Sequence, residues 1–316
     1  MPLNVHGDEF RAMGCTVRLE VVGDGEADTV TGVSIARARI AELERVWSRF
    51  LPESDISRLN AAQGAMVPVH PATIELLQAM VQGFAATDGC FDPTMLAPLV
   101  ALGYDASWSD PRMSVSLPVG AAARGDVREI AVDRIALVAQ LPSGTVLDAG
   151  GVGKGLAADM VVTELLGAGL AGAMVSIGGD LRVAGVGPHE GAWVIGVADA
   201  FDDGGSGPDV VQLSLANAGV ATSGTLRRAW RDPNGVAVHH LLDPASCRPV
   251  QETVQATVVA GTAAWAEVFT KLLMVRGVSA LASLDELRLA ARVVLTDSSS
   301  HCNDAWRALE LSCIRS

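Results

Sequence analysis

The segment TVLDAGGVGKGLAADMV, residues 145–161, joins an apolar stretch, a glycine-rich turn, one lysine and the start of a helical pattern. This order is typical of a loop that binds an anion. Glycines allow backbone N–H groups to approach a phosphate closely, and the N-terminus of the following helix favours negative charge. The segment therefore predicts a strand, a glycine loop and then a helix that ends near Gly167.

Two familiar nucleotide-binding loops do not fit this segment. The loop of nucleotide hydrolases needs a glycine, four residues and then Gly-Lys-Ser/Thr. Asp148 stands at the place of that first glycine, and Gly155 stands at the place of the hydroxyl residue. The dinucleotide-binding pattern Gly-x-Gly-x-x-Gly fails as well, because the third glycine comes one place too early. The sequence thus predicts an anion site without either of these folds.

The hydrophobic pattern on both sides of the loop predicts strands in consecutive runs with helices inserted singly. Such an order favours an α+β fold rather than a doubly wound sheet. The 316 residues are enough for one large domain or two modest ones. We expect one strand over residues 10–23 and two strands over 172–187 that are joined by a turn at Gly178-Gly179. We also expect helices over 34–50, 71–89 and 262–277, a hairpin that turns at 142–144, and a low-complexity surface loop over 202–209.

Composition limits the classes of function. Hydrophobic residues make up 49% of the 316 residues and charged residues 19%, so a sizeable core is expected. The net charge of −13 argues against nucleic acid as a partner. No uninterrupted apolar run reaches 18 residues, and the N-terminal segment lacks the apolar stretch of an export signal; we expect a cytoplasmic protein that does not span a membrane. Five cysteines without a Cys-x-x-Cys pair predict neither a disulfide framework nor a zinc site.

Several short stretches occur together in a fixed order, and together they resemble the ApbE family of flavin transferases. The similarity extends from about residue 10 to residue 280, and it implies a single domain over residues 1–316 with mixed, largely antiparallel sheets and packed helices. The stretches are AMGC (12–15), SRFLPESDISRLN (48–60), FDPTMLAPL (91–99), DAGGVGKG (148–155), SIGGD (176–180), ATSGTLRRAW (221–230) and HHLLDP (239–244).

The resemblance implies that the chain takes FAD as a substrate and transfers its FMN half to a threonine or serine of an acceptor protein through a phosphoester, releasing AMP. The acceptor pattern of the family's targets, Asp-x-x-Ser/Thr-Gly-Ala-Thr, does not occur in this chain, so we do not expect self-modification. Two other functions stay open: a protein that binds FAD without turning it over, and an FAD pyrophosphatase that uses water as the nucleophile.

The resemblance also assigns residues to the FAD site. Lys154 suits this role because a mobile positive charge neutralises a diphosphate. Phe50 is an aromatic that could stack on a planar ring, and Pro93 keeps the loop that carries Phe91 and Asp92 rigid. The full set implied for FAD binding is Met13, Phe50, Phe91, Asp92, Asp148, Lys154, Asp180 and Leu241.

His240 is the candidate base that removes a proton from the acceptor hydroxyl, since an imidazole titrates near neutral pH. It matches the catalytic histidine of the family's His-Ile-Ile-Asp-Pro motif. Strand alternation puts His239 on the opposite face, so we expect His239 to have a structural role. Asp243 is the second catalytic candidate; it either orients the site or begins the turn that Pro244 enforces.

The expected magnesium site departs from the family pattern. The family has aspartate and threonine four residues apart on a helix, together with a backbone carbonyl of the glycine loop. Here Glu267 replaces the aspartate, and Lys271 stands at the threonine position. Either the charge of Lys271, paired with Glu267 four residues away, replaces the metal, or the two side chains form an ordinary ion pair on the helix surface and the site is impaired. If Lys271 is a bystander, Glu267, Thr270 and the Gly151 carbonyl hold Mg²⁺.

Overall fold

A computed structural model describes residues 3–108, 110–202 and 209–313, so most of the predicted low-complexity loop, residues 203–208, lies outside the described residues. The chain divides into two compact units, which are described separately. The first unit contains residues up to 40, residues 154–227 and residues from 251; the second contains residues 41–153 and 228–250. No helix in the described part of the chain has the length and apolar character needed to cross a membrane.

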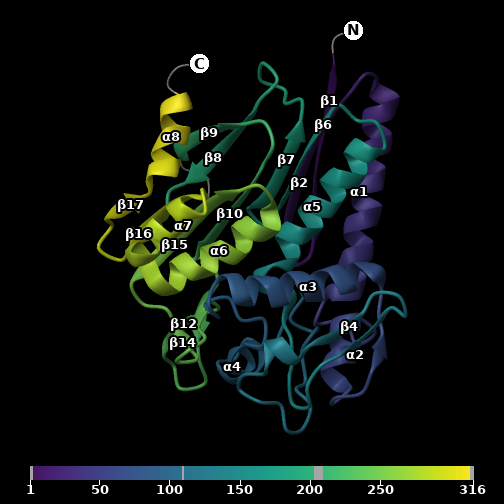
Figure 1. Ribbon diagram of the computed structural model, residues 1–316, viewed down its shortest axis with the longest axis vertical. Helices are drawn as coiled ribbons and strands as arrows, with labels where there is room; N and C mark the ends of the chain where they lie inside the picture. The colour runs from purple at the N-terminus through teal and green to yellow at the C-terminus, as the bar shows by residue number, and fades with distance from the viewer. Residues whose placement is uncertain (1–2, 109, 203–208, 314–316) are drawn as a thin grey trace. The chain divides into compact units, whose positions relative to one another are not determined.

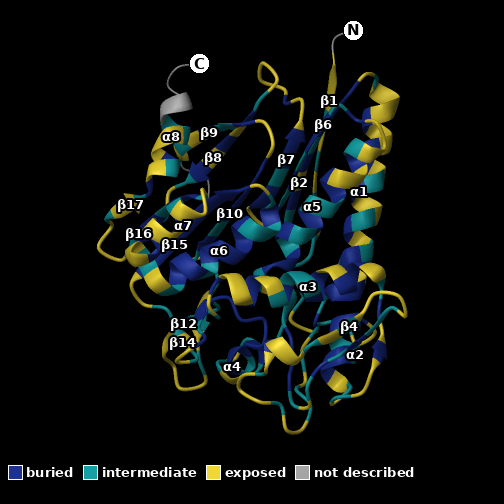
Figure 2. Ribbon diagram, in the orientation of Figure 1, coloured by how far each residue is buried: buried dark blue, intermediate teal, exposed yellow. Residues whose placement is uncertain are grey.

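The first unit is built on an eight-stranded sheet in which every neighbouring pair of strands is antiparallel (Figure 1). The strands in spatial order are β1 (Asn4–Ala12), β2 (Cys15–Gly23), β6 (Gly172–Ile177), β7 (Asp180–Gly185), β10 (Ala218–Gly224), β15 (Thr253–Ala260), β16 (Ala290–Leu295) and β17 (Ser300–Cys302). Figure 2 shows the difference between centre and edge: β15 is buried along its whole length, whereas β1 is partly exposed throughout.

Two tight turns set the register of this sheet. Met13 and Gly14, with φ of 50° and 68°, form the two-residue turn between β1 and β2. Positive φ at both central positions is the geometry whose twist matches an antiparallel hairpin. Gly178 and Gly179, with φ of 63° and 97°, make the turn between β6 and β7, as the Gly-Gly pair predicts.

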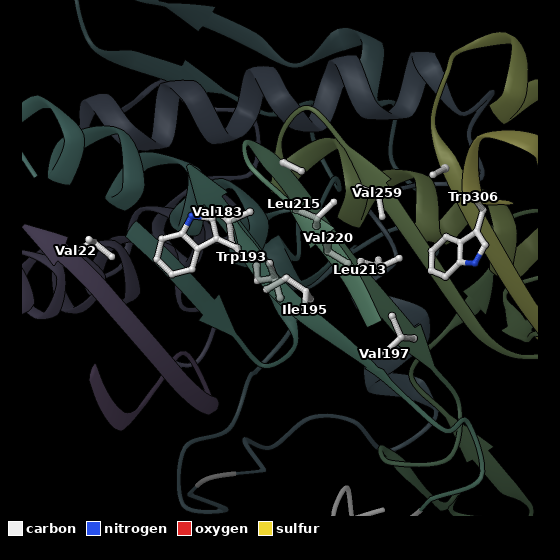
Figure 3. Packing of buried hydrophobic residues seen from close by; sticks show 13 residues of the cluster. Val22, Val183, Trp193, Ile195, Val197, Leu213, Leu215, Val220, Val259 and Trp306 are labelled. Atoms are coloured by element: carbon white, nitrogen blue, oxygen red, sulfur yellow. The ribbon is translucent and has the colours of Figure 1, made fainter. Parts of the chain in front are cut away.

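One face of the large sheet packs on the hairpin of β8 (Trp193–Ala198) and β9 (Asp209–Leu215) and on α8 (Asp304–Cys313). Their shared core includes Trp193, at 2% exposure, and Trp306, at 0% (Figure 3). Val22 of β2 belongs to this core as well.

The opposite face of the sheet packs against helices. A Cβ atom placed on Gly32 of α1 (Glu26–Trp47) would meet Val21 of β2 and Leu165 of α5 (Gly153–Gly167). The adjacent residues Val21 and Val22 therefore face the two layers, as strand geometry requires. The remaining helices of this unit are α6 (Ala263–Arg276), η3 (Gly277–Ala280) and α7 (Leu281–Glu286).

The second unit consists of short helices and small sheets. A three-stranded sheet has the order β3 (Val67–Pro68), β5 (Val138–Gln140) and β4 (Ala131–Asp133). The other elements are α2 (Asp55–Ala61), α3 (Pro71–Ala86), α4 (Leu96–Ala101), η1 (Val127–Glu129), η2 (Ala149–Gly151), the hairpin of β11 (Ala229–Arg231) and β12 (Ala237–His239), and the hairpin of β13 (Leu242–Asp243) and β14 (Arg248–Pro249).

The α+β class with largely antiparallel sheets is confirmed, but some local predictions are wrong. The Met13–Gly14 turn divides the single strand predicted over residues 10–23 into β1 and β2. The predicted hairpin after residue 130 also turns at another place. The hairpin of β4 and β5 turns at residues 134–137, not at 142–144. The Asp133 carboxylate accepts hydrogen bonds from the backbone N–H groups of Ile135 and Ala136, which closes the turn early. Residues 145–148, predicted as a strand, form no strand.

Candidate functional site

The glycine loop leads into α5 at a place where α5 passes very close to α6. A Cβ atom on Gly155 would lie 2.4 Å from the backbone oxygen of Ala263 and 2.7 Å from the backbone nitrogen of Ala264. Only glycine fits there, which explains why a hydroxyl residue is absent after the lysine. The close approach lets the Gly155 N–H donate to Oε2 of Glu267 at 2.8 Å.

A second contact holds the two helices together. The Asp159 carboxylate of α5 accepts hydrogen bonds from the first N–H groups of α6, those of Ala263 and Ala264, at 2.8 and 2.9 Å. Arg182 of β7 lies 3.3 Å from the same carboxylate. Burial raises the pKa of Asp159, and the two backbone donors and Arg182 oppose that shift. Asp159 thus caps α6 and fixes the position of Glu267, one turn further along that helix.

Lys154, Asp180 and Glu267 form a cluster of charged groups inside the first unit. The Lys154 ammonium forms an ion pair with Asp180 at the start of β7, and it lies 3.3 Å from Oε1 of Glu267. The side chains of Asp180 and Glu267 are 2% and 0% exposed. The structure thus brings together three predicted site residues that are distant in the sequence.

Electrostatics keeps the lysine of this cluster charged. Burial alone would lower the pKa of Lys154, but the carboxylates of Asp180 and Glu267 outweigh burial and hold it above its usual value. Burial raises the pKa of Glu267, and the nearby Asp180 carboxylate adds to this shift, whereas Lys154 and Lys271 oppose it. A buried charge needs such partners, because an isolated one would cost several kcal/mol or more.

Lys271 occupies a pocket of oxygen atoms beside this cluster. Its ammonium donates to Oγ of Ser223 at 3.1 Å, to the backbone oxygen of Glu267 at 3.1 Å and to Oγ1 of Thr270 at 3.2 Å. A carboxylate oxygen, Oε1 of Glu267, lies at 4.0 Å. The three protons of the ammonium therefore have three oxygen acceptors.

This pocket does not fit Mg²⁺ while Lys271 occupies it. Magnesium needs about six oxygen ligands at roughly 2.0–2.1 Å. The oxygens that Glu267, Thr270 and Ser223 would offer are arranged around the Lys271 ammonium at hydrogen-bond distances. Among the residues described, no group of three or more His, Cys, Asp or Glu side chains is placed to hold a metal ion.

The second unit fixes Asp148 at the beginning of the glycine loop. The Asn60 amide donates to the backbone oxygen of Leu147 at 2.9 Å and accepts from its N–H at 2.7 Å, in the manner of a strand neighbour. The Asp148 N–H donates to the backbone oxygen of Pro93, and the Asp148 carboxylate caps η2 by accepting from the N–H of Gly150 at 3.0 Å. Instead of the strand predicted over residues 145–148, the chain is an irregular segment whose backbone is held by the Asn60 side chain.

Phe50 lies in a group of aromatic and charged side chains. The Arg49 guanidinium stacks 4.7 Å from the ring centroid of Phe50 and 4.6 Å from that of Tyr104. It also lies 3.6 Å from the Asp148 carboxylate. Two residues implied for FAD binding, Phe50 and Asp148, are therefore connected through Arg49, which the sequence reasoning did not single out.

Phe91 and Asp92 lie deeper in the second unit. Phe91 is 2% exposed, and its N–H donates to the hydroxyl of Thr87. The Asp92 carboxylate is fully buried and accepts from the N–H and hydroxyl of Thr94, at 2.8 and 2.6 Å, and from Arg124 at 3.1 Å. These bonds hold the loop in one conformation, and a direct contact of either side chain with FAD stays a prediction.

The two adjacent histidines have different surroundings. Nε2 of His239 bonds to the backbone oxygen of Val250 at 2.9 Å, and Nδ1 accepts from the N–H of Leu241 at 3.3 Å. Both nitrogens of the His239 ring form hydrogen bonds with the backbone, in agreement with the structural role expected for His239. His240 follows β12 and is half-buried. Leu241 is 7% exposed, and its part in FAD binding stays a prediction.

Asp243 makes the hydrogen bonds of a turn. Its carboxylate accepts from the N–H of Ala245 and from the hydroxyl of Ser246, both at 2.9 Å, between β13 and β14. Of the two roles expected for Asp243, the structure places it in the turn, and a catalytic role stays a prediction. Met13, in the β1–β2 turn, and Gly151, at the end of η2, are half-buried, and their assigned roles stay predictions too.

Sequence reasoning missed two residues that support the site, Asn60 and Arg49, and it gave Ser223 a different role. Each belongs to a stretch that carries the family resemblance, and Arg49 directly precedes Phe50. Their sequence positions alone do not reveal which backbone or side-chain atom each one contacts. The sequence predicts a tight polar turn at residues 223–225 that lines the acceptor groove or only turns a strand. In the structure Ser223 instead belongs to β10 and bonds to Thr270 and Lys271 on α6.

Comparison with known proteins shows a consistent similarity. The model of the ApbE family matches residues 13–293. The FAD:protein FMN transferase of Rhodobacter capsulatus is 26% identical over 275 residues, which are 85% of this chain and 51% of that protein. The FAD:protein FMN transferase of Salmonella typhimurium is 27% identical over 277 residues, 85% of this chain and 78% of that protein. The chain thus spans about half the length of the first relative.

Solved structures share the fold. The ApbE protein of Thermotoga maritima superimposes with a TM-score of 0.83 at 23% identity, over 97% of this chain and 99% of the other. The flavinyl transferase ApbE of Pseudomonas stutzeri, in its apo form, gives a TM-score of 0.79 at 24% identity, over 98% of this chain and 97% of the other. At these identities the similarity shows the fold.

Proposed function

Because the chain belongs to the ApbE family, we propose that it transfers FMN from FAD to a serine or threonine hydroxyl of an acceptor protein and releases AMP. The names of the curated relatives support this activity. The observation that carries the proposal is the group of ionised side chains around Lys154. Burying opposite charges together costs desolvation energy that an apolar core would avoid, so such groups are typical of functional sites.

In the proposed reaction, the oxygen of the acceptor hydroxyl forms a bond to the phosphorus of the FMN half. The bond from that phosphorus to the bridging oxygen breaks, and AMP leaves with that oxygen. The hydroxyl proton passes to the His240 imidazole, since an imidazole is a base that works near neutral pH. The products are a phosphoester-linked flavin on the acceptor and free AMP.

Lys154 supplies positive charge for the diphosphate of FAD. Phosphoryl transfer depends mainly on positioning and on neutralising the phosphate oxygens. The adjacent carboxylates keep the Lys154 ammonium charged. The Asn60–Leu147 hydrogen bonds and the Asp148–Gly150 cap hold the beginning of the same loop in place. Asp148 then accepts hydrogen bonds from the flavin or adenine part of the substrate.

Incubation with FAD and a synthetic peptide that carries Asp-x-x-Thr-Gly-Ala-Thr tests the proposal. Transfer gives AMP together with a peptide whose mass has increased by one FMN less one water. Production of AMP and free FMN with unmodified peptide would instead identify a pyrophosphatase. FAD that is bound and recovered intact would identify a flavin-binding protein without turnover. A second peptide with alanine for both threonines controls for non-covalent flavin.

A further inference from the structure

We propose that the Lys271 ammonium is a built-in cation in a pocket that would otherwise hold a divalent metal, so that this chain binds and uses FAD without Mg²⁺. The part that concerns FAD rests on the proposed function. The part that concerns the pocket rests only on contacts within the first unit, and it can be tested without FAD.

The hydrogen bonds of the pocket are mutually consistent. The Thr270 hydroxyl donates to the backbone oxygen of Glu267 at 2.6 Å, so in its 2.7 Å contact with Ser223 it is the acceptor. Both hydroxyl oxygens then direct lone pairs at the Lys271 ammonium. Two hydroxyls, a backbone oxygen and a nearby carboxylate thus surround the ammonium with oxygen atoms, which are the ligands that hard cations prefer.

The charges of the site balance only when Lys271 is included. Asp180 and Glu267 contribute two negative charges, and Lys154 neutralises one of them. Lys271 neutralises the other, because its ammonium lies 4.0 Å from Oε1 of a completely buried Glu267 side chain. Without Lys271 the pocket would hold oxygen ligands and one excess negative charge, which is the environment that recruits a metal ion.

Lysine usage in the chain supports a special role. Of the 23 basic residues, only Lys154 and Lys271 are lysines, and every other one is an arginine. A lysine ammonium is a compact charge with three N–H donors, which matches the three oxygen acceptors that surround the Lys271 nitrogen. An arginine guanidinium is planar and presents its donors as a fork, so it would not fit these three acceptors.

Metal binding can be measured directly with Mn²⁺ as the probe, by electron paramagnetic resonance in the absence of FAD. We expect the wild type to bind no Mn²⁺ and Lys271→Ala to bind about one per chain, since its oxygen pocket and excess negative charge remain. The control Lys271→Ala with Glu267→Gln lacks the charge and should bind none. Stoichiometric binding by the wild type that Glu267→Gln abolishes would overturn the proposal, as would a folded Lys271→Ala variant that binds no Mn²⁺.

A second measurement uses the wild type alone and does not depend on the folding of a variant. Protein labelled with ¹⁵N-lysine contains two side-chain ammonium groups, and a hydrogen-bonded, shielded ammonium exchanges its protons slowly enough for detection by NMR. Addition of Mg²⁺ should leave the Lys271 signal, assigned by its loss in Lys271→Arg, unchanged. A saturable shift or loss of that signal with Mg²⁺ would show that a metal displaces the ammonium, which contradicts the proposal.

Titration with FAD connects the pocket to the proposed function. Wild-type affinity for FAD should be equal in EDTA and in Mg²⁺. Lys271→Ala should bind FAD about tenfold more weakly or worse in EDTA, because a buried carboxylate has lost its partner, and Mg²⁺ should restore part of that loss. Affinity of the wild type only in Mg²⁺ would overturn the proposal. If no FAD bound under any condition, the proposed function would fail while the Mn²⁺ result still decided the nature of the pocket.

Discussion

Gly155 and Glu267 are joined by a hydrogen bond of 2.8 Å from the Gly155 N–H to a carboxylate oxygen. The first turn of α5 is therefore bonded to the second turn of α6. The N-terminus of a helix attracts negative charge, and at Gly155 an internal carboxylate already provides it. The loop thus differs from that of a nucleotide hydrolase, because one of the first N–H groups of the helix donates to a carboxylate of the protein itself.

Gly155→Ala should strongly destabilise the protein. The added Cβ would lie 2.4–2.7 Å from backbone atoms of Ala263 and Ala264, and backbone atoms move less readily than side chains. Overpacking of this kind costs about 1–3 kcal/mol or more. The matched control is Gly167→Ala at the other end of α5, where nothing lies within 4 Å of the new atom. Urea unfolding of both variants measures the difference; equal stability would contradict the close packing of α5 on α6.

His240→Ala should lose FMN transfer and keep FAD affinity, because it removes the proposed base without removing a charge that binds the diphosphate. The expected loss is about 10²–10⁴-fold in the rate of peptide modification. His239→Gln serves as the control and should retain the transfer rate. Its two backbone hydrogen bonds make it a stability residue, so His239→Gln should lower the free energy of unfolding by about 1 kcal/mol. An unchanged rate in His240→Ala would mean that another group is the base.

The stability of the protein should fall on acidification partly because of His239. Burial lowers the pKa of His239 below its ordinary value, and the hydrogen bond to Val250 opposes the shift only in part. The unfolded chain therefore binds a proton at a higher pH than the folded one, so the His239 contribution is complete above about pH 6.5 and is lost as the pH falls through the lower folded pKa. Denaturant unfolding at several pH values should show a smaller pH dependence in His239→Gln than in the wild type.

Much of the fold follows from local patterns. Gly-Gly at 178–179 predicts a turn between two strands, and the apolar spacing over residues 262–277 predicts a helix; both are confirmed, as is the family resemblance. These features depend on residues close together in the chain. The predicted position of the turn between β4 and β5 was wrong. The sequence Pro-Ser-Gly at 142–144 is typical of a turn, but the chain turns earlier, where the Asp133 carboxylate accepts a backbone hydrogen bond.

The candidate site was less predictable because its contacts connect distant residues. The sequence places Glu267 and Lys271 four residues apart, which suggests a helix-surface ion pair. It does not show that Ser223, from β10, supplies an oxygen to the same ammonium. It also does not show that Asn60 replaces a strand neighbour for Leu147. Such pairings depend on sheet order and helix packing.

Asn60→Ala should weaken both the second unit and FAD binding. Its amide satisfies a donor and an acceptor of the buried Leu147 backbone, and each unsatisfied group costs about 1–3 kcal/mol. Asn60→Asp keeps the acceptor but sets a carboxylate against the Leu147 oxygen, so we expect no rescue. Asn234→Ala, in an exposed turn of the same unit, should change stability by less than about 0.5 kcal/mol. Wild-type FAD affinity in a folded Asn60→Ala variant would contradict the role of Leu147 in positioning Asp148.

FAD should bind more tightly than FMN, because the charge of Lys154 matches a diphosphate better than a single phosphate. Isothermal titration with both ligands should show a preference of about tenfold, roughly 1.4 kcal/mol. The variant Lys154→Met cannot be interpreted alone, since it leaves Asp180 and Glu267 buried with one positive charge between them.

Charge-balanced variants isolate the effect of Lys154. The double variant Lys154→Met with Asp180→Asn removes one positive and one negative charge, so Glu267 still faces Lys271 and the net charge of the cluster is unchanged. Asp180→Asn alone keeps the Lys154 ammonium and provides the reference. If Lys154 recognises the diphosphate, the ratio of FAD to FMN affinity falls toward one in the double variant and is retained in Asp180→Asn. Equal or tighter binding of FMN by the wild type would rule out the diphosphate as the feature that is recognised, and an unchanged ratio in the double variant would assign that recognition to another residue.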